Sequence, residues 1–167
     1  MGRRIAVAAG GLVLGILGLL VAFLLSMRFK FQPVQRLVRR VNRAFWNPMA
    51  MKTAGEPDAA ASIVRHVGRT SGNLYETPVG AVETEEGFII SLPYGTSPDW
   101  LKNVRAAGEA VVVHGGTAWK VDSPEIVSSD VGNAYFAPSD QRVHRIFGVD
   151  DFLTLRRVGE DAATRPD

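Results

Sequence analysis

The residues whose types and spacing could do chemistry lie between positions 66 and 103. Residues 66–72 read His-Val-Gly-Arg-Thr-Ser-Gly, which places one guanidinium and two hydroxyl groups between glycines. A turn of this composition can direct an Arg side chain and several backbone N–H groups at one anion, as proteins do when they hold phosphate without a metal. Residues 77–79, Thr-Pro-Val, follow as a rigid backbone on which a flat ring can lie. The alternative is an ordinary hairpin loop whose glycines only permit positive φ.

A second stretch, residues 92–103, contains Leu-Pro-Tyr-Gly and then Asp-Trp-Leu-Lys-Asn at the start of a predicted helix. Lys102 and Asn103 are donors on the first turns of this helix, whose N-terminal end also favours anions. Trp100 has the alternative of a core anchor, the common place of a helical Trp beside Leu and Val.

Other chemistries lack residue support. The three histidines are widely separated and have no carboxylates at metal-ligand spacing, so we expect no metal site. The chain has neither a G-x-S-x-G elbow nor a carboxylate pair typical of hydrolases. Cysteine is absent, which excludes disulfides and thiolate nucleophiles and fits a reducing compartment.

The charge is divided unevenly between two parts of the chain. Residues 1–55 carry nine of the nineteen Lys and Arg and no acidic residue, whereas all seventeen Asp and Glu come later. The acidic part would repel nucleic acid, and the basic part adjoins an apolar run where Lys and Arg meet anionic lipid headgroups. We therefore expect membrane lipid as a partner and no nucleic acid.

The apolar run over residues 5–25 reaches roughly 30 Å as a helix, enough to cross the hydrocarbon core of a bilayer. More cationic residues follow this run than precede it, which by the positive-inside rule predicts a single-pass anchor in the cell membrane with the following domain in the cytoplasm. The alternative is a cleaved signal peptide, although no small-x-small site follows the run. Gly11 and Gly15 have the GxxxG spacing that allows two helices to approach, so a homodimer is a further alternative.

The pattern of the remaining chain predicts four parts: the anchor (1–29), an amphipathic juxtamembrane helix and linker (30–58), a β domain (59–158) and a disordered tail (159–167). The amphipathic helix covers 33–46, ends at Asn47-Pro48, and lies along the membrane or packs its apolar stripe on the domain core. Short strands are expected over 62–67, 76–84, 88–92, 109–114, 117–121 and 152–157, with a two-residue turn at Gly115-Gly116. One helix, capped by Ser97 and closed by Gly108, interrupts them, and another covers 139–147. This succession predicts a mainly β (α+β) fold, a small barrel with an inserted helix.

These residues resemble the deazaflavin-dependent nitroreductase family of split β-barrel, FMN-binding-like oxidoreductases, which use coenzyme F420. The resemblance covers residues 66–121 and rests on H-x-G-R-x-S-G, T-P-V, P-Y-G, D-W-x-x-N and A-x-G in that order. It implies that the phosphate and polyglutamate side of F420 lies on the loop with Arg69, Thr70, Ser71 and Gly72. It implies that Thr77, Pro78 and Val79 line the ring, and that Tyr94, Gly95, Trp100, Lys102 and Asn103 form the second binding segment.

The resemblance also implies hydride transfer from reduced deazaflavin to an acceptor, without a side-chain nucleophile. Tyr94 and Tyr135 are the candidate proton donors. With the anchor, a membrane quinone such as menaquinone is the expected acceptor, beside nitroaromatic compounds. The chain departs from the family pattern at Thr70, Tyr75 and Gly80, which leaves two alternatives: a non-catalytic cofactor- or lipid-binding barrel, and an FMN-binding flavoprotein.

Overall fold

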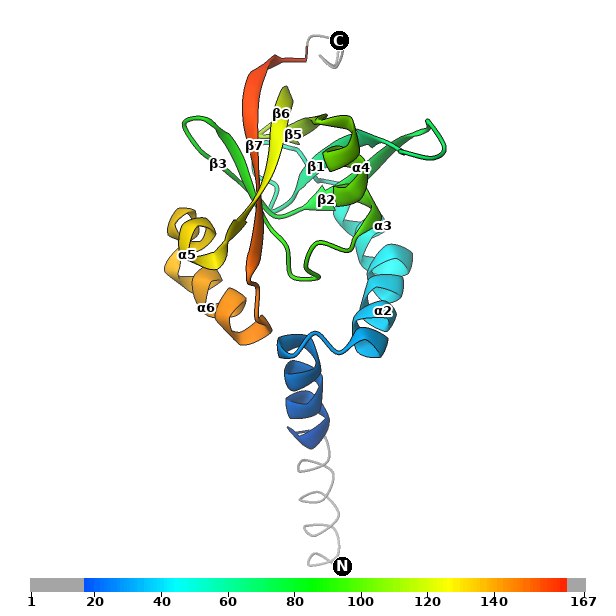
Figure 1. Cartoon of the computed structure of the whole chain (residues 1–167), viewed down its shortest axis with the longest axis vertical. Helices are drawn as coiled ribbons and strands as arrows, with labels where there is room; N and C mark the ends of the chain where they lie inside the picture. The colour runs from blue at the N-terminus through cyan, green and yellow to red at the C-terminus, as the bar shows by residue number, and fades with distance from the viewer. Residues whose placement is uncertain (1–16, 162–167) are drawn as a thin grey trace, which may run out of the picture.

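The computed structural model describes residues 17–161 (Figure 1). The helices are a first helix over Leu17–Arg28, α2 (Gln32–Val41), the π-helical turn η1 (Asn42–Trp46), α3 (Asn47–Ala50), α4 (Asp99–Ala107), α5 (Ser129–Gly132), the 3-10 turn η2 (Asn133–Tyr135) and α6 (Pro138–Phe147). The strands are β1 (Ser62–Val67), β2 (Leu74–Val79), β3 (Ala81–Glu83), β4 (Gly87–Ser91), β5 (Glu109–His114), β6 (Thr117–Ser128) and β7 (Asp151–Glu160).

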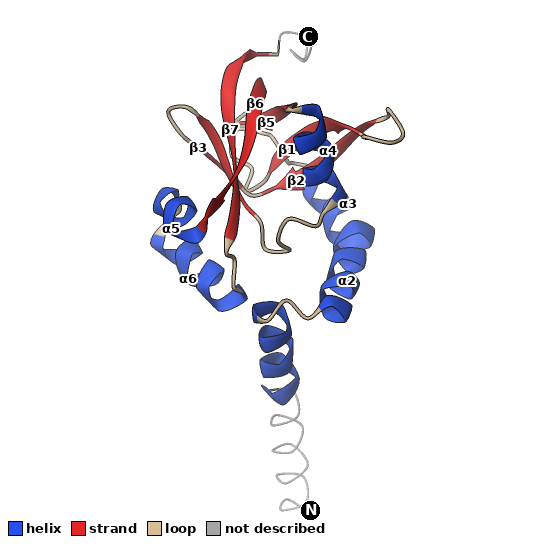
Figure 2. Cartoon of the chain, in the orientation of Figure 1, coloured by secondary structure: helices blue, strands red, loops and turns tan. Residues whose placement is uncertain are grey.

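The seven strands form one antiparallel sheet in the order β2-β1-β5-β6-β7-β4-β3. The two edge strands, β2 and β3, are consecutive in the chain and are separated only by Gly80. A flat sheet cannot bring its two edges within one residue of each other, so the sheet must curl. The result is an α+β half-barrel with helices around a central sheet (Figure 2).

The main core fills the concave side of this sheet. It contains buried residues from six of the strands, all except β3, together with α4, whose Leu101 and Val104 are fully buried. Burial of each such side chain contributes about 1.5–3 kcal/mol relative to exposure, which fixes α4 against the sheet. A smaller cluster around Phe136 and Phe152 packs the segment of α5, η2 and α6 against strands β3, β4, β6 and β7.

The predicted strands 62–67 and 109–114 are confirmed, as is the turn at Gly115-Gly116, where both φ angles are positive. The predicted strand 76–84 is wrong as one strand, because Gly80 breaks it into β2 and β3. Strand β6 is longer than expected, since two register shifts around 120–125 let it bend and continue to Ser128. Strand β7 also extends to Glu160, two residues into the predicted tail; residues 162–167 lie outside the described part of the chain.

The inserted helix α4 ends at Gly108 in the left-handed conformation (φ 76°), as predicted. The predicted cap is wrong: the residue before the helix is Pro98, and no side chain caps it. The Ser97 hydroxyl accepts a hydrogen bond from Arg39 of α2 instead, at 2.9 Å. The second predicted helix is confirmed as α6, beginning one residue earlier at Pro138.

The predicted end of the juxtamembrane helix at Asn47-Pro48 is also wrong. Helical structure continues through η1 and α3 to Ala50. The reason is local, because Pro48 stands in the first turn of α3, where its missing N–H costs no hydrogen bond.

Helix α2 packs against the domain with its polar side chains. Gln35 is 1% exposed, and Arg39 of α2 and Asn42 of η1 both bond to the loop 93–98. Its larger apolar side chains point outward: Leu37 is 60% exposed and Phe45, in η1, is 70% exposed. The alternative in which this stripe packs on the domain core is therefore wrong.

In the described part of the chain, no single helix has both the length and the apolar character needed to cross a membrane. The first helix and Gln32–Ala50 meet these criteria only as a pair with a sharp bend between them. Most of the predicted span over 5–25, including Gly11 and Gly15, lies outside the described residues, so the single-pass anchor stays a prediction.

Candidate functional site

The loop between β1 and β2 forms a compact turn held by its own backbone. The N–H of Gly68 donates to Asn73 O and that of Gly72 to Gly68 O, both at 2.8 Å. Gly72 adopts φ +69°, and a Cβ on Gly68 would lie 2.7 Å from Cε2 of Tyr75. Both glycines are therefore required by the geometry of the turn.

Arg69 joins this loop to the start of α4. Its Nη1 donates to Asn103 Oδ1 at 2.8 Å, and its backbone N–H donates to the same oxygen at 3.2 Å. Its Nη2 lies 3.1 Å from Asp99 Oδ1. Its Nη1 also donates to the backbone oxygen of Asp99 at 3.4 Å. The guanidinium is exposed and held in one position, and its Nε–H and one N–H of Nη2 have no partner among residues 17–161.

Asn103 is held in turn by His66, and both side chains are buried, at 6% and 5% exposure. The Asn103 amide nitrogen lies 3.2 Å from His66 Nδ1, and His66 Nε2 lies 3.2 Å from Thr77 Oγ1. Because an amide nitrogen only donates, Nδ1 is the acceptor and the imidazole proton is on Nε2. Burial lowers the pKa of His66, which keeps the ring in this neutral form.

Arg69, Thr77 and Asn103, all predicted site residues, thus belong to one network that also includes His66 and Asp99. The network connects β1, β2, the loop between them and α4. Figure 1 shows α4 beside these two strands.

Lys102 lies next to this network on the first turns of α4, and its exposed ammonium group has no ion pair within residues 17–161. Thr70, Ser71 and Gly72 are also exposed. The Ser71 hydroxyl lies 3.1 Å from the hydroxyl of Tyr75, whose ring stacks on His66. The exposed groups around Arg69 are therefore hydroxyl groups, one further cation and the carboxylate of Asp99, which pairs with Arg69.

The residues predicted to line a ring divide into two kinds. Thr77 and Pro78 are half-buried on β2, and the Thr77 hydroxyl is engaged by His66. Val79 belongs to the main core, and half-buried Trp100 packs against that core, as the core-anchor alternative expected. The side chains of Val79 and Trp100 therefore pack in or against the main core and stabilise the backbone that carries the site residues.

Tyr94 contacts the start of η1 and takes no part in the hydrogen-bonded network of Arg69. Its hydroxyl accepts a hydrogen bond from Asn42, and burial raises its pKa, opposed by this bond and by the charge of Arg39. Gly95 completes the turn with φ +65° and a 2.9 Å bond from its N–H to Leu92 O.

Tyr135 is separate from these groups. It is 52% exposed in η2, next to α5, which lies on the other side of the sheet from α4 (Figures 1 and 2). The structure therefore brings Arg69, Thr77 and Asn103 together and places Tyr135 apart from them.

Sequence reasoning assigned no role to His66, Asp99 or Asn42. His66 had a usable signal, because a polar residue in a strand of mostly apolar residues predicts a buried hydrogen-bonding partner. In the structure His66 pairs with Tyr75 across the strands and contacts Thr77 diagonally. Asn42 had none, since its contact with Tyr94 depends on where α2 docks. Within residues 17–161, no three His, Asp or Glu side chains lie close enough together to hold a metal ion.

No protein-family model and no curated protein matches the chain. Among solved structures, one named F420 Reductase is similar with a TM-score of 0.43 and 11% sequence identity, over 66% of this chain and 94% of that chain. A likeness of this size does not assign an activity, so a function for this chain has to be argued from its own residues.

Proposed function

We propose that this chain is an F420-dependent oxidoreductase that transfers a hydride from the reduced deazaflavin to an acceptor. The observation that carries the proposal is the 2.8 Å contact between Arg69 and Asn103. These residues belong to the two sequence segments that resemble the two cofactor-binding segments of F420-dependent enzymes, and they meet although 34 positions separate them.

The site fits the anionic side of the cofactor. Asp99 and Asn103 hold the Arg69 guanidinium in place, so little side-chain entropy is lost when its free N–H groups bind a phosphate oxygen. Lys102 offers a second positive charge near the N-terminal end of α4, where the helix dipole also attracts anions. The polyglutamate tail of F420 would bind there.

On the ring side, the backbone of residues 77–79 and the half-buried Pro78 would support the deazaflavin. Bound deazaflavin supplies the hydride from its C5. The chain contributes position and exclusion of water, and Tyr94 is the residue that we propose for a hydrogen bond to the reacting groups. Because burial raises the pKa of Tyr94, its hydroxyl keeps its proton at neutral pH.

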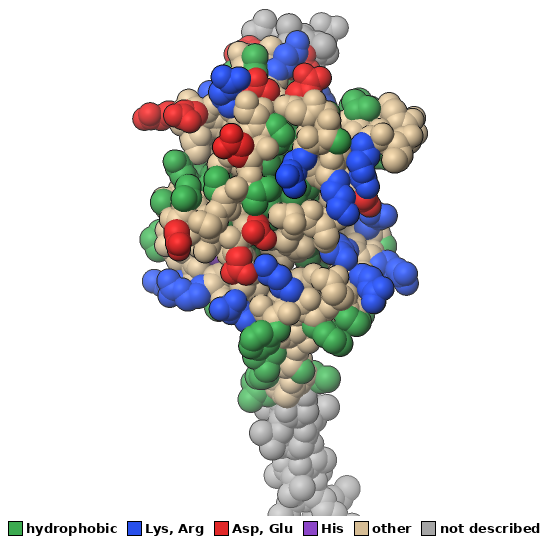
Figure 3. Space-filling view, in the orientation of Figure 1, with side chains coloured by type: hydrophobic (Ala, Val, Ile, Leu, Met, Phe, Trp, Pro, Cys, Tyr) green, Lys and Arg blue, Asp and Glu red, His purple; other side chains and the backbone are tan. Residues whose placement is uncertain are grey.

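For the acceptor we propose a membrane quinone of the menaquinone type, with nitroaromatic compounds as alternative acceptors. The support is the exposed apolar surface of Leu17–Leu25, α2 and η1, together with its Arg residues. Figure 3 shows hydrophobic side chains where the domain meets the first helix and Lys and Arg side chains around that end. A domain attached to the cytoplasmic face of the cell membrane would meet its quinone there.

The test is an anaerobic titration of the purified full chain in neutral detergent with F420 and, separately, with FMN. We expect F420 to bind and the reduced, bound cofactor to be oxidised when a menaquinone analogue is added. Lys102→Gln should weaken F420 with its polyglutamate tail and leave FMN nearly unchanged, because FMN has no such tail.

Other results select the alternatives. Binding of F420 without oxidation by any quinone or nitroaromatic compound would make the chain a cofactor carrier. Preference for FMN would make it a flavoprotein. If neither F420 nor FMN binds, the Arg69 loop is only a hairpin connection between β1 and β2, and the proposal is wrong.

A further inference from the structure

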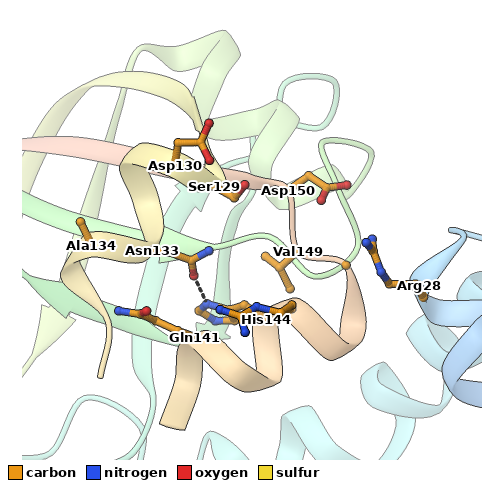
Figure 4. A pocket seen from close by; sticks show the side chains of 11 residues that line it. Arg28, Ser129, Asp130, Asn133, Ala134, Gln141, His144, Val149 and Asp150 are labelled. Carbon is orange, nitrogen blue, oxygen red and sulfur yellow. Dashed lines mark hydrogen bonds between the residues drawn. The ribbon is translucent and has the colours of Figure 1, made fainter. Parts of the chain in front are cut away.

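A cavity of about 520 Å³ lies at the junction of the first helix with α5, η2 and α6. Residues from all four elements line it, among them Arg28, Asn133, His144 and Arg145 (Figure 4). None of the residues proposed to hold F420 belongs to its lining. The cavity is therefore a separate place on the molecule for which the hydride transfer gives no role.

The charges of the cavity favour an anion. Lys30 lies 3.0 Å from Asp150 Oδ2, which neutralises one of the two carboxylates in the lining. Arg28 and Arg145 have no ion pair in the described part of the chain, 17–161. Two guanidinium groups thus stand against the one remaining carboxylate, that of Asp130.

A buried polar side chain on the cavity wall lacks a partner on one side. His144 is 7% exposed, and its Nδ1 lies 2.8 Å from Asn133 Oδ1. Its Nε2 has no hydrogen-bond partner among the described residues, and the amide nitrogen of Asn133 also has none. Figure 4 shows both side chains at the wall of the cavity. Neither nitrogen is completely buried, so each is accessible to a ligand or to water.

The cavity is next to the part of the chain that carries the exposed apolar surface. Leu25 is 50% exposed, and Arg28 follows it by three residues, a rise of roughly 4.5 Å along a helix. Arg28 packs closely on the end of α6, where a Cβ on Gly148 would lie 2.8 Å from Arg28 Nη1. If the first helix is inserted in a bilayer, the cavity is level with the headgroups.

We propose that this cavity binds the phosphate group of an anionic glycerophospholipid. Arg28 and Arg145 hold the phosphate, and the amide of Asn133 with the Nε2 side of His144 bonds to the headgroup or glycerol. This inference rests on the membrane attachment included in the proposed function and is independent of F420. A phosphate ester in solution has the same chemistry, so the experiment separates the two sources.

The experiment uses the full chain in neutral detergent micelles. It is titrated with dihexanoyl phosphatidylglycerol, with dihexanoyl phosphatidylcholine and with inorganic phosphate, and binding is followed by calorimetry and by the NMR signals of the His144 ring. Arg28→Gln and Arg145→Gln remove one guanidinium each. Arg142→Gln is the matched control, because Arg142 is an exposed residue of α6 that does not line the cavity.

We expect phosphatidylglycerol to bind more tightly than the other two ligands and to shift the His144 signals. Arg28→Gln and Arg145→Gln should each weaken this binding at least tenfold, while Arg142→Gln changes it less than twofold. An equal loss of phosphatidylglycerol affinity in all three variants would mean that the lipid is attracted only by the net charge of the protein. That result would overturn the proposal. Inorganic phosphate binding as tightly as phosphatidylglycerol would overturn the lipid as the ligand.

Two further measurements on the same samples separate this proposal from the proposed function. Failure of the wild-type chain to enter anionic vesicles would remove the membrane attachment and this proposal with it. Entry into vesicles without binding of phosphatidylglycerol would overturn the cavity alone. Binding of F420, measured by fluorescence, should not change in Arg28→Gln or Arg145→Gln.

Discussion

At the scale of single residues, the candidate site depends on a relay of hydrogen bonds that ends on an exposed cation. His66 orients the amide of Asn103, and the Asn103 oxygen positions Arg69. The pair of Arg69 and Asp99 lies at the surface, where such ion pairs contribute about 0–1 kcal/mol to stability. Arg69 is therefore better placed to bind a ligand than to stabilise the fold.

Arg69→Gln should weaken F420 binding about tenfold to a hundredfold, since a hydrogen bond to a charged group contributes about 1.5–3 kcal/mol. The measurement is a fluorescence titration with F420, beside the thermal midpoint of each variant. Arg105→Gln, at an exposed position of the same helix, is the control and should bind as the wild type does. If Arg69→Gln binds F420 with unchanged affinity, the phosphate of F420 does not bind at Arg69.

Acidification should destabilise the folded chain through His66. Its folded pKa is below the ordinary value of 6.5, so the unfolded chain takes up a proton first as the pH falls. The contribution of neutral His66 is therefore present above pH 6.5 and is lost below it. His66→Gln, which stays neutral, should show a smaller decrease in unfolding free energy between pH 7 and pH 5. Equal decreases in both proteins would contradict the burial of this imidazole.

At the scale of elements, the glycines of the sheet have unequal roles. A Cβ on Gly87 would collide with backbone atoms of β7, including Arg157 N at 2.7 Å. A Cβ on Gly80 would meet nothing within 4 Å, and Gly80 has no positive φ. The bend between β2 and β3 thus tolerates a side chain, whereas the pairing of β4 with β7 does not.

We therefore expect Gly87→Ala to lower the unfolding free energy by about 2 kcal/mol or more, through displacement of the β4–β7 pair. Gly80→Ala is the matched control and should change it by less than about 1 kcal/mol, or raise it slightly by restricting the unfolded chain. Chemical denaturation of both variants in the same detergent measures the difference. Similar effects would mean that β4 and β7 adjust without cost.

Much of the element order was predictable, because apolar strands, paired glycines and a glycine-closed helix are local signals. The break at Gly80 was not, since it depends on the order of strands that pair far apart in the sequence. In the site, the loop of Arg69 was recognisable from residue types, and the structure brings it to Asn103. The roles of Asn42 and Arg39 came only with the docking of α2, which no local pattern encodes.

At the scale of the whole molecule, helix α2 and η1 turn apolar side chains away from the domain. Trp46 is 60% exposed and Met49, in α3, is 61% exposed. Arg36, Arg40 and Arg43 flank them, and residues 17–55 contain no acidic side chain. A second copy would bring the same positive charges to this surface, so the partner that we propose for it is an anionic bilayer.

A truncated chain beginning at Arg28 should still bind vesicles that contain anionic lipid, and more weakly as salt is raised. Phe45→Ser with Trp46→Ser should reduce this binding at least fivefold, because both rings lose their insertion into the interface. Cosedimentation with vesicles measures it, and far-UV circular dichroism confirms that the variant is folded. Binding that survives this double substitution would assign the attachment to the charges alone.

The position of β7 has a consequence for how the chain is made. This last strand lies between β6 and β4, so β4 lacks one neighbour until residues 151–160 have left the ribosome. The sheet therefore cannot be completed before residues 151–160 are synthesised, and a chain that stops before residue 151 would expose the unpaired edge of β4.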